Sequence, residues 1–330
     1  MSSAINWGLV IQGPIIGFGQ GPNNSKSGFN AYEVIQKNIE AFAPYVEKIV
    51  VSTWIGSRFA LSNHELSKGV VLLENQLPSE RDHDNRIKQF TSTLAGINHL
   101  NQFPQITHIV KIRTDQLIDP GIIKWLTDFY SHSPNGFDKK DTTQKNYLIF
   151  SEYRKDSPFY LGDFVIAGEK EDAAQFCKSN LSFGSKNLHP SIGIDYVLKY
   201  LFGTDRALHS YFYAYIPMLW QLANLSNKAT QSYWENILHN RFSIIPKYFY
   251  ETIQWRGRLM TKVLSPEVIA GFSFFEEWSQ TRGSKDINLI PKNCGYLFPN
   301  YQVFYTAKYE YIRYFRAIFK YYLKKLKVLR

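Results

Sequence analysis

The sequence predicts an α/β fold in which helices cover a mostly parallel sheet, followed by a helical C-terminal part rich in aromatic residues. Short apolar runs of strand length alternate with segments of helical periodicity over the first half of the chain. Hydrophobic residues make up 44% and charged residues 20% of the 330 residues, a composition that supports a sizeable core. The chain is long enough for one large domain or for two smaller ones.

The elements of the first half follow from these patterns in order. The strands share an apolar run that stops at a turn signal; they are predicted at 7–12, 48–54, 69–74 and 108–113. The helices share apolar residues three or four positions apart; they are predicted at 31–43, 85–100 and about 120–130. Strands that alternate with helices in this way favour a parallel sheet.

The second half continues this pattern and then changes character. After a polar insert at 136–146, strands are predicted at 147–152 and 164–167, and helices near 169–180 and 191–201. From residue 202 onward the chain is rich in aromatic residues and proline, which is typical of short helices and loops. We expect three parts: an α/β domain at 1–205, a helical extension packed on it at 206–300, and a C-terminal helix at 301–330.

The net charge of +10 is concentrated in the last thirty residues. Residues 301–330 contain eight lysines or arginines and one acid, Glu310, so the first 300 residues carry a net charge of only +3. This distribution excludes a nucleic-acid footprint along the whole chain, and we expect no nucleic-acid partner. The two cysteines, Cys177 and Cys294, form neither a disulfide framework nor a metal-finger spacing. With no signal peptide or membrane span in the pattern, we expect a cytoplasmic protein.

Polar residues that end predicted strands are the first candidates for chemistry, because ligands of open α/β sheets bind at the carboxyl ends of strands. Gln12, Gly13 and Pro14 end the first strand and lead into a glycine-rich loop whose N–H groups suit a phosphate or a base. The loop lacks the spacing of a P-loop or of a dinucleotide-binding motif, so an ordinary surface loop is an equal alternative.

Two further candidates combine charge with an element end. Arg113 and Asp115 follow the fourth predicted strand, where a carboxylate can coordinate a divalent cation that bridges phosphate oxygens. A turn or helix-cap role for Asp115, and a pair between Arg113 and Asp115, are the alternatives. Arg86 lies at the start of a predicted helix, where an arginine and a helix N-terminus favour an anion, although this segment also fits a solvated cap.

Two later carboxylates are candidates for a general base. Asp163 precedes a predicted strand and Asp195 lies in a predicted helix, and for each a purely structural role is an equal alternative. No hydrolase or thiol-redox motif occurs in the chain.

Taken together, the segments resemble the WavE-type lipopolysaccharide-biosynthesis family, whose members look like GT-A-type glycosyltransferases. The resemblance rests on six short elements that occur in order: VIQGPI (10–15), IVVSTW (49–54), DNRIKQFTSTLAGI (84–97), KIRTD (111–115), SPFYLGDFVIAGEKED (157–172) and FSIIPKYFYETIQW (242–255). Together they span about three quarters of the chain.

The resemblance implies a GT-A-like, Rossmann-like domain that binds a nucleotide sugar. The donor-binding residues on this interpretation are Gln12, Gly13, Pro14, Trp54, Arg86, Arg113 and Asp115. Asp115 would hold Mg²⁺ or Mn²⁺ on the donor diphosphate, Asp195 would be the catalytic base, and Asp163 is the second choice. The chain departs from the pattern because Gln116 and Leu117 follow Asp115 where a second acid is expected, which puts the metal in doubt.

The C-terminal residues have the pattern of an amphipathic helix. From about residue 309, aromatic and aliphatic side chains lie on one arc and basic side chains on the next, a division that suits a helix in the plane of an anionic membrane surface. The predicted membrane contacts are Arg313, Phe315, Arg316, Phe319, Lys320, Lys324 and Lys327. A helix docked on the protein core, or one that binds a partner, is the alternative.

These features lead to one functional prediction and two rivals. We expect a glycosyltransferase, peripheral on the inner face of the cell membrane, that transfers a sugar from a nucleotide-sugar donor to a glycan or glycolipid acceptor in lipopolysaccharide or capsule. The first rival is a nucleotidyl- or phosphotransferase that uses the same strand-end Asp115. The second is a membrane adaptor without catalytic activity.

Overall fold

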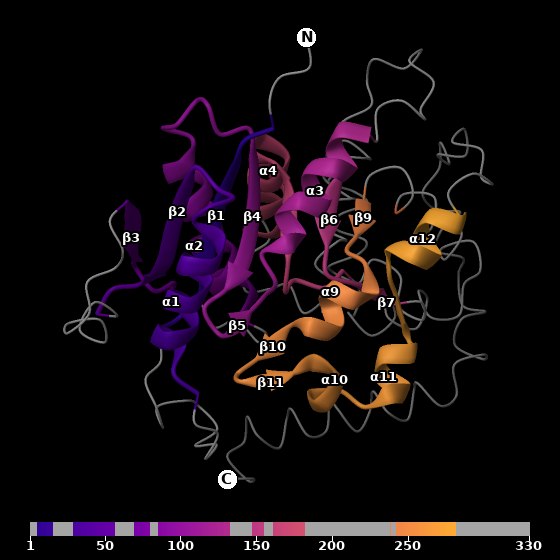
Figure 1. Cartoon of the computed structure of the whole chain (residues 1–330). Coiled ribbons are helices and arrows are strands. Elements are labelled where there is room, and N and C mark those ends of the chain that lie inside the picture. Colours follow the sequence, from indigo (N-terminus) through magenta and orange to yellow (C-terminus); the bar gives the residue numbers. More distant parts are fainter. Residues whose placement is uncertain are drawn as a thin grey trace, which may run out of the picture.

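The computed structural model describes residues 5–15, 29–56, 69–79, 85–132, 147–154, 161–181, 238 and 242–281, and its centre is one seven-stranded sheet (Figure 1). In spatial order the strands are β3 (Val70–Asn75), β2 (Lys48–Trp54), β1 (Trp7–Gln12), β4 (His108–Arg113), β8 (Ile166–Glu169), β6 (Leu148–Phe150) and β9 (Phe242–Ile244). The pairs are parallel apart from those of β8, which is antiparallel to β4 and β6. The predicted mostly parallel α/β sheet is therefore confirmed.

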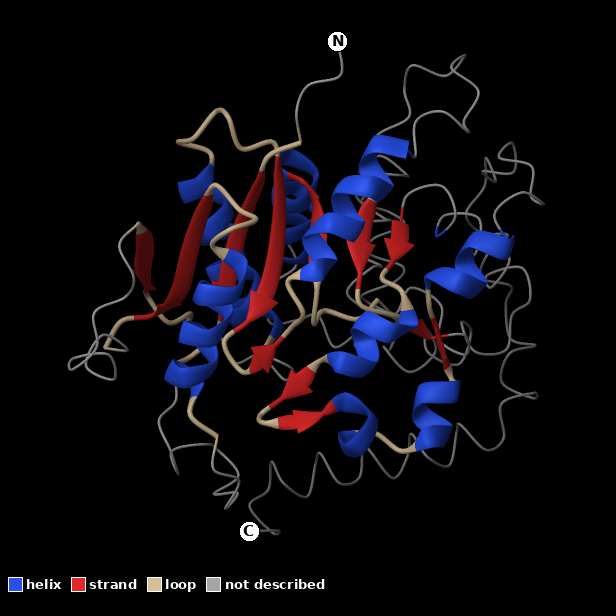
Figure 2. Cartoon of the chain, viewed as in Figure 1, coloured by secondary structure: helices blue, strands red, loops and turns tan. Residues whose placement is uncertain are grey.

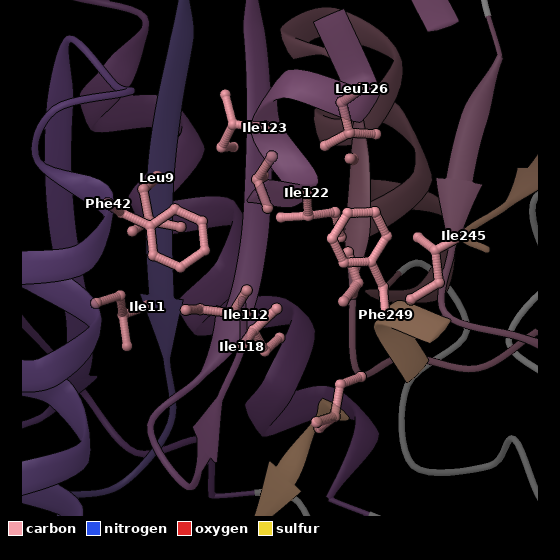
Figure 3. Packing of buried hydrophobic residues seen from close by; sticks show 14 of the residues in the cluster. Leu9, Ile11, Phe42, Ile112, Ile118, Ile122, Ile123, Leu126, Ile245 and Phe249 are labelled. Atoms are coloured by element: carbon pink, nitrogen blue, oxygen red, sulfur yellow. The ribbon is translucent and has the colours of Figure 1, made fainter. Parts of the chain in front are cut away.

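Helices cover both faces of this sheet, since the residues of its central strands are buried on both faces. They are α1 (Ala31–Phe42), α2 (Arg86–Leu100), α3 (Gly121–His132) and α4 (Lys170–Leu181). Leu9 and Ile11 of β1 pack with side chains of α1 and α3 in one apolar cluster (Figure 3), whereas Val10 packs with side chains of α2 and α4 on the opposite face. All three are fully buried, so β1 contributes to the core on both of its faces.

The position of α2 depends on a glycine. A Cβ on Gly96 would stand 2.6 Å from Cγ1 of Val10, so only a glycine lets the helix lie this close to β1. Because α2 follows β3 in the chain, it begins at the carboxyl edge of the sheet. The close packing therefore brings the first turn of α2 next to the ends of β1 and β2.

The strand order reverses its direction at β1. From β1 the chain adds β2 and then β3 on one side, and it then crosses to place β4 on the other side of β1. The register aligns Gln12 with Ser52 of β2 and with Arg113 of β4, so β1 and β4 end at the same level and β2 continues beyond them to Trp54. A crevice at the carboxyl ends of two strands where the order reverses is the usual ligand site of an open α/β sheet.

Residues 242–281 contribute strands as well as helices (Figure 2). They contain α9 (Lys247–Thr252), β10 (Gln254–Trp255), β11 (Arg258–Leu259), α10 (Met260–Val263), α11 (Pro266–Ala270), β12 (Phe272–Ser273) and α12 (Phe275–Thr281). Two small sheets join this segment to the first half, through β5 (Gln116–Leu117) in the order β11-β10-β5 and through β7 (Tyr153–Arg154) beside β12. The sequence pattern predicts only a helical extension here.

Strand β9 is the clearest difference from that expectation. It pairs in parallel with β6 at the edge of the central sheet, so this part of the chain completes the sheet as well as packing on it. A three-residue strand has too few positions to show an alternating pattern, so β9 could not be predicted from the sequence.

Several expectations fall on residues outside the described ranges. These are the polar insert at 136–146, the helix at 191–201, the domain boundary near 205 and the C-terminal helix at 301–330. Within the described ranges, no helix combines the length and the apolar character needed to cross a bilayer.

Candidate functional site

A cavity of about 350 Å³ opens at the carboxyl ends of β1, β2 and β4, where the strand order reverses. Six of the seven predicted donor-binding residues line it: Gln12, Gly13, Pro14, Trp54, Arg113 and Asp115. The structure therefore brings these residues to one cavity, because side chains at the ends of neighbouring parallel strands converge, and their binding of a donor stays a prediction.

The floor of the cavity is a tight contact between the ends of β1 and β4. Gly13 has a φ of +136°, and a Cβ there would stand 2.6 Å from Oγ1 of Thr114. The Gly13 amide donates to the Ser52 carbonyl at 3.1 Å, and the Thr114 hydroxyl donates to the Pro14 carbonyl at 2.9 Å. The glycine thus lets the end of β1 lie close to the Thr114 side chain, whereas residues 16–28 of the glycine-rich loop lie outside the described ranges.

Asp115 lies at the centre of a hydrogen-bond cluster on the cavity wall. Its Oδ1 accepts from Arg113 Nε at 2.9 Å, and its Oδ2 accepts from Arg113 Nη2 at 3.1 Å. Oδ2 also accepts from Trp255 Nε1 at 2.9 Å and from Arg256 Nε at 3.3 Å. The carboxylate therefore joins the end of β4 to the hairpin formed by β10 and β11.

Hydrogen bonds to the backbone around Asp115 hold this cluster in place, from α1 on one side and from β10 on the other. The Asn38 side chain of α1 donates to the Gln116 carbonyl at 2.6 Å and accepts from the Ile118 amide at 3.4 Å, within the buried core. β5 pairs with β10, and the Arg256 amide donates to the Asp115 carbonyl at 2.8 Å. Arg256 has a φ of +52°, the left-handed conformation that the tight turn before Gly257 demands.

The electrostatics of the cluster follow from these contacts. Burial alone would raise the pKa of Asp115, but the charge and hydrogen bonds of Arg113, with the contacts of Trp255 and Arg256, lower it below its usual value. Burial would lower the pKa of Arg113, and the carboxylates of Asp115 and Asp163 reverse this and raise it. At neutral pH the cluster is one carboxylate between two guanidinium groups.

Asp163 lies directly behind the cavity wall. Its side chain is 29% exposed, accepts a hydrogen bond from Gln89, and stands 3.8 Å from Nη1 of Arg113. Burial would raise the pKa of Asp163, yet the positive charges of Lys111 and Arg113 bring it below its usual value. Asp163 is therefore an ionised neighbour of Arg113, placed next to the cavity and outside its lining.

Two buried titratable groups support the segment around Asp163. Lys111 of β4 is fully buried and donates from Nζ to the Asp163 carbonyl at 2.5 Å; burial lowers the pKa of this lysine to about 8. Glu152 is 2% exposed, and burial raises its pKa to about 8 with help from the nearby Asp163 charge. A Cβ on Gly162 would stand 2.1 Å from the Glu152 carboxyl group, so the glycine makes room for it.

Arg86 does not occupy the place expected for it. It is buried at the first position of α2, with 7% of its surface exposed, and it is not among the residues that line the cavity. The same helix end instead presents Asn85, Lys88 and Gln89 to the cavity. The rotation of a helix about its own axis decides which of several polar residues in one turn faces a site. The periodicity of the sequence alone did not determine this rotation.

The remaining predicted site residues lie outside the described part of the chain. These are the candidate base Asp195 and the seven predicted membrane contacts of the C-terminal helix.

The site residues that sequence reasoning missed come from three separate segments. Arg256 is 141 residues from Asp115 in the chain, Lys88 lies on α2, and Phe29 precedes α1. Trp255 is the final residue of the last of the six resembling elements. Its position next to Arg256 was the signal in the sequence that could have pointed to this arginine.

The described residues do not fit the divalent cation that the resemblance implies at Asp115. Two guanidinium groups and an indole already donate to its two oxygens, and two adjacent positive charges repel a cation. No group of three or more His, Cys, Asp or Glu side chains gathers within the described ranges to complete a coordination shell. The donor set suits an anion in the cavity better than a hard cation.

The chain is similar in structure to several transferases at low sequence identity. A 4-diphosphocytidyl-2C-methyl-D-erythritol synthase from Anaerococcus prevotii is 11% identical, with a TM-score of 0.35 over 61% of this chain and 84% of that one. A glycosyltransferase involved in glycosylation of the major capsid of PBCV-1 is 12% identical, with a TM-score of 0.29 over 60% and 76%.

A third similar structure is the manganese complex of Rv0371c from Mycobacterium tuberculosis, 10% identical, with a TM-score of 0.31 over 51% of this chain and 75% of that one. No protein-family model and no curated protein sequence matches this chain.

Proposed function

We propose that this protein is a glycosyltransferase that uses a nucleotide-diphospho-sugar donor. The observation that carries the proposal is the charged cavity at the carboxyl ends of β1 and β4, where the strand order reverses. Among the described residues, its wall combines three cationic side chains, one carboxylate and the aromatic rings of Trp54 and Phe29. Positive charge suits a diphosphate and an aromatic ring suits a base, so the cavity offers both halves of a nucleotide site.

The transfer would proceed by displacement at the anomeric carbon of the donor sugar. The acceptor oxygen forms its bond to that carbon while the bond from the carbon to the diphosphate breaks and leaves its electron pair on the diphosphate. The cationic side chains of the cavity would stabilise this leaving group, and a carboxylate would take the acceptor proton.

The lowered pKa of Asp163 makes it a poor proton acceptor, since a general base works best with a pKa near the working pH. This favours Asp195 as the base, as the resemblance implies, and leaves Asp163 to hold Arg113 in place.

A thermal-shift panel tests the proposal directly. UDP-, GDP-, ADP- and dTDP-sugars are added with and without Mn²⁺, and one of them should raise the melting temperature by several degrees. A ligand at one hundred times its Kd adds about 2.7 kcal/mol to the free energy of unfolding, which is enough for such a rise. A flat response to the whole panel would favour the adaptor without catalytic activity.

The same three cationic side chains would also suit the triphosphate of a nucleotidyltransferase substrate. The products distinguish the two reactions, because glycosyl transfer releases a nucleoside diphosphate and nucleotidyl transfer releases pyrophosphate. We expect the nucleoside diphosphate.

We further propose that the acceptor is a growing glycan of lipopolysaccharide or capsule, and that residues 301–330 hold the enzyme on the cytoplasmic face of the membrane. The support is the WavE-type resemblance and the eight basic residues interleaved with aromatic ones in this segment. Cosedimentation with anionic lipid vesicles, with and without residues 305–330, is the test. Equal binding of both proteins would exclude the membrane role.

A further inference from the structure

The four hydrogen-bond donors around Asp115 indicate a role other than the metal ligation that its position at the end of a strand suggests. Two oxygens that accept four hydrogen bonds have little capacity left for a metal ion. All of these donors are side chains with fixed geometry, two guanidinium groups and an indole. Asp115 is placed to orient the two arginines, which come from β4 and from the turn between β10 and β11.

The two arginines differ in how many N–H groups remain available. Arg113 uses Nε and Nη2 on Asp115, and its Nη1 stands 3.8 Å from Asp163. Arg256 uses only Nε, and neither of its Nη atoms forms a hydrogen bond within the part of the chain that the structure describes. The Arg256 side chain is 34% exposed and lines the cavity. Its outer edge is therefore available to a ligand.

Packing holds the Arg256 guanidinium in position before any ligand arrives. Its carbon lies 5.0 Å from the centre of the Trp255 ring, and the Trp255 indole is itself fixed on Asp115. Lys88 reaches the cavity from α2, where its ammonium contacts Asn85 at 3.4 Å. With Arg113, Arg256 and Lys88 against the single charge of Asp115, the described lining has a net formal charge of +2.

We propose that Arg256 and Lys88 bind the diphosphate of the donor without a divalent cation, and that Asp115 is a positioning residue for Arg256 instead of a metal ligand. The inference rests on the proposed function and adds to it the side chains that neutralise the charge of the diphosphate. The two free Nη groups of a planar guanidinium match two phosphate oxygens, and a net charge of +2 offsets that of a diphosphate bridge.

Isothermal titration of the full-length protein with UDP, GDP, CDP, ADP and inorganic pyrophosphate tests this inference, first in EDTA and then in Mn²⁺. At least one nucleoside diphosphate should bind in EDTA, with a Kd within about threefold of that in Mn²⁺. Arg256→Gln should weaken it by about ten- to one-hundred-fold, the usual loss for a charge-assisted hydrogen bond. Arg258→Gln, an exposed arginine of the same hairpin, is the matched control and should change the Kd less than twofold.

Two further variants separate positioning from folding. Lys88→Gln changes a residue with no bond to Asp115, and it should weaken binding by about tenfold even if Arg256→Gln folds poorly. Asp115→Asn should weaken binding by the same factor in EDTA and in Mn²⁺, because it acts through Arg256. A metal ligand would lose affinity only in Mn²⁺. A thermal melt of Asp115→Asn that matches wild type distinguishes positioning from a general loss of structure, which would also weaken binding in both conditions.

The outcomes also separate this inference from the proposed function. Nucleoside diphosphates that bind only with Mn²⁺, or that bind Arg256→Gln as tightly as wild type, would overturn the inference and leave the transferase proposal standing. Binding of pyrophosphate alone, sensitive to Arg256→Gln, would support the anion site and count against a nucleotide donor. No binding of any of the five anions would refute both.

Discussion

Replacing Glu152 with glutamine should remove a strong pH dependence from the stability of this protein. The Glu152 carboxyl group is 2% exposed, and its Oε2 finds no hydrogen-bond partner in the described ranges. Burial raises its pKa from the ordinary 4.5 to about 8, and the charge of Asp163 acts in the same direction. The folded protein therefore keeps this carboxyl group protonated at pH values where the unfolded chain has lost the proton.

The sign and size of the effect follow from linkage. Since the folded pKa lies above the unfolded one, the stability contributed by Glu152 is complete below pH 4.5 and is lost as the pH rises to about 8. Each pH unit in that interval costs about 1.4 kcal/mol, so the whole interval corresponds to about 5 kcal/mol. Glutamine does not titrate, and the Glu152→Gln variant should lack this loss.

Urea denaturation of both proteins between pH 4.5 and pH 9 measures the effect. The difference in unfolding free energy between variant and wild type should rise towards pH 8, in favour of the variant, and then level off. Glu40→Gln, on the exposed side of α1, removes the same charge in solvent and serves as the control. A difference that stays constant over this range would refute a buried, protonated Glu152.

Three other predictions concern the supports of the site. Gly13→Ala should cost about 1–3 kcal/mol of stability and weaken nucleotide binding, because a Cβ would stand 2.6 Å from a threonine hydroxyl. Gly257 also has a positive φ but has open space around it, so Gly257→Ala measures the cost of the backbone conformation alone in thermal melts. Asn38→Ala should cost about 1–3 kcal/mol in urea denaturation, since it leaves a buried carbonyl of β5 without its donor. For Lys111, the pKa of about 8 lies below the ordinary 10.5, so wild-type stability should rise by about 3 kcal/mol as pH increases between these values, and Lys111→Met should abolish the rise.

The sequence indicated six of the residues that line the cavity because the end of a strand can be recognised from the local sequence. Apolar runs at 7–12, 48–54 and 108–113 coincide with β1, β2 and β4, and the polar residues that follow them in a parallel sheet must share one edge. The same reasoning could not orient side chains on a helix, where Arg86 was expected and Lys88 lines the cavity. It also could not find β9 or the hairpin of β10 and β11, whose strands are too short to carry a pattern.

By itself, the sequence determined the α/β class, the central strands and the position of Asp115 at the end of β4. Only the tertiary structure decided which groups contact Asp115, because its partners Trp255 and Arg256 come from 140 and 141 residues further along the chain. From the local sequence, a carboxylate at the end of a strand fits a metal ion and an arginine equally well, and the charges around it decide between them. Folding supplies those charges by bringing distant segments together, and here the charges that meet Asp115 are positive.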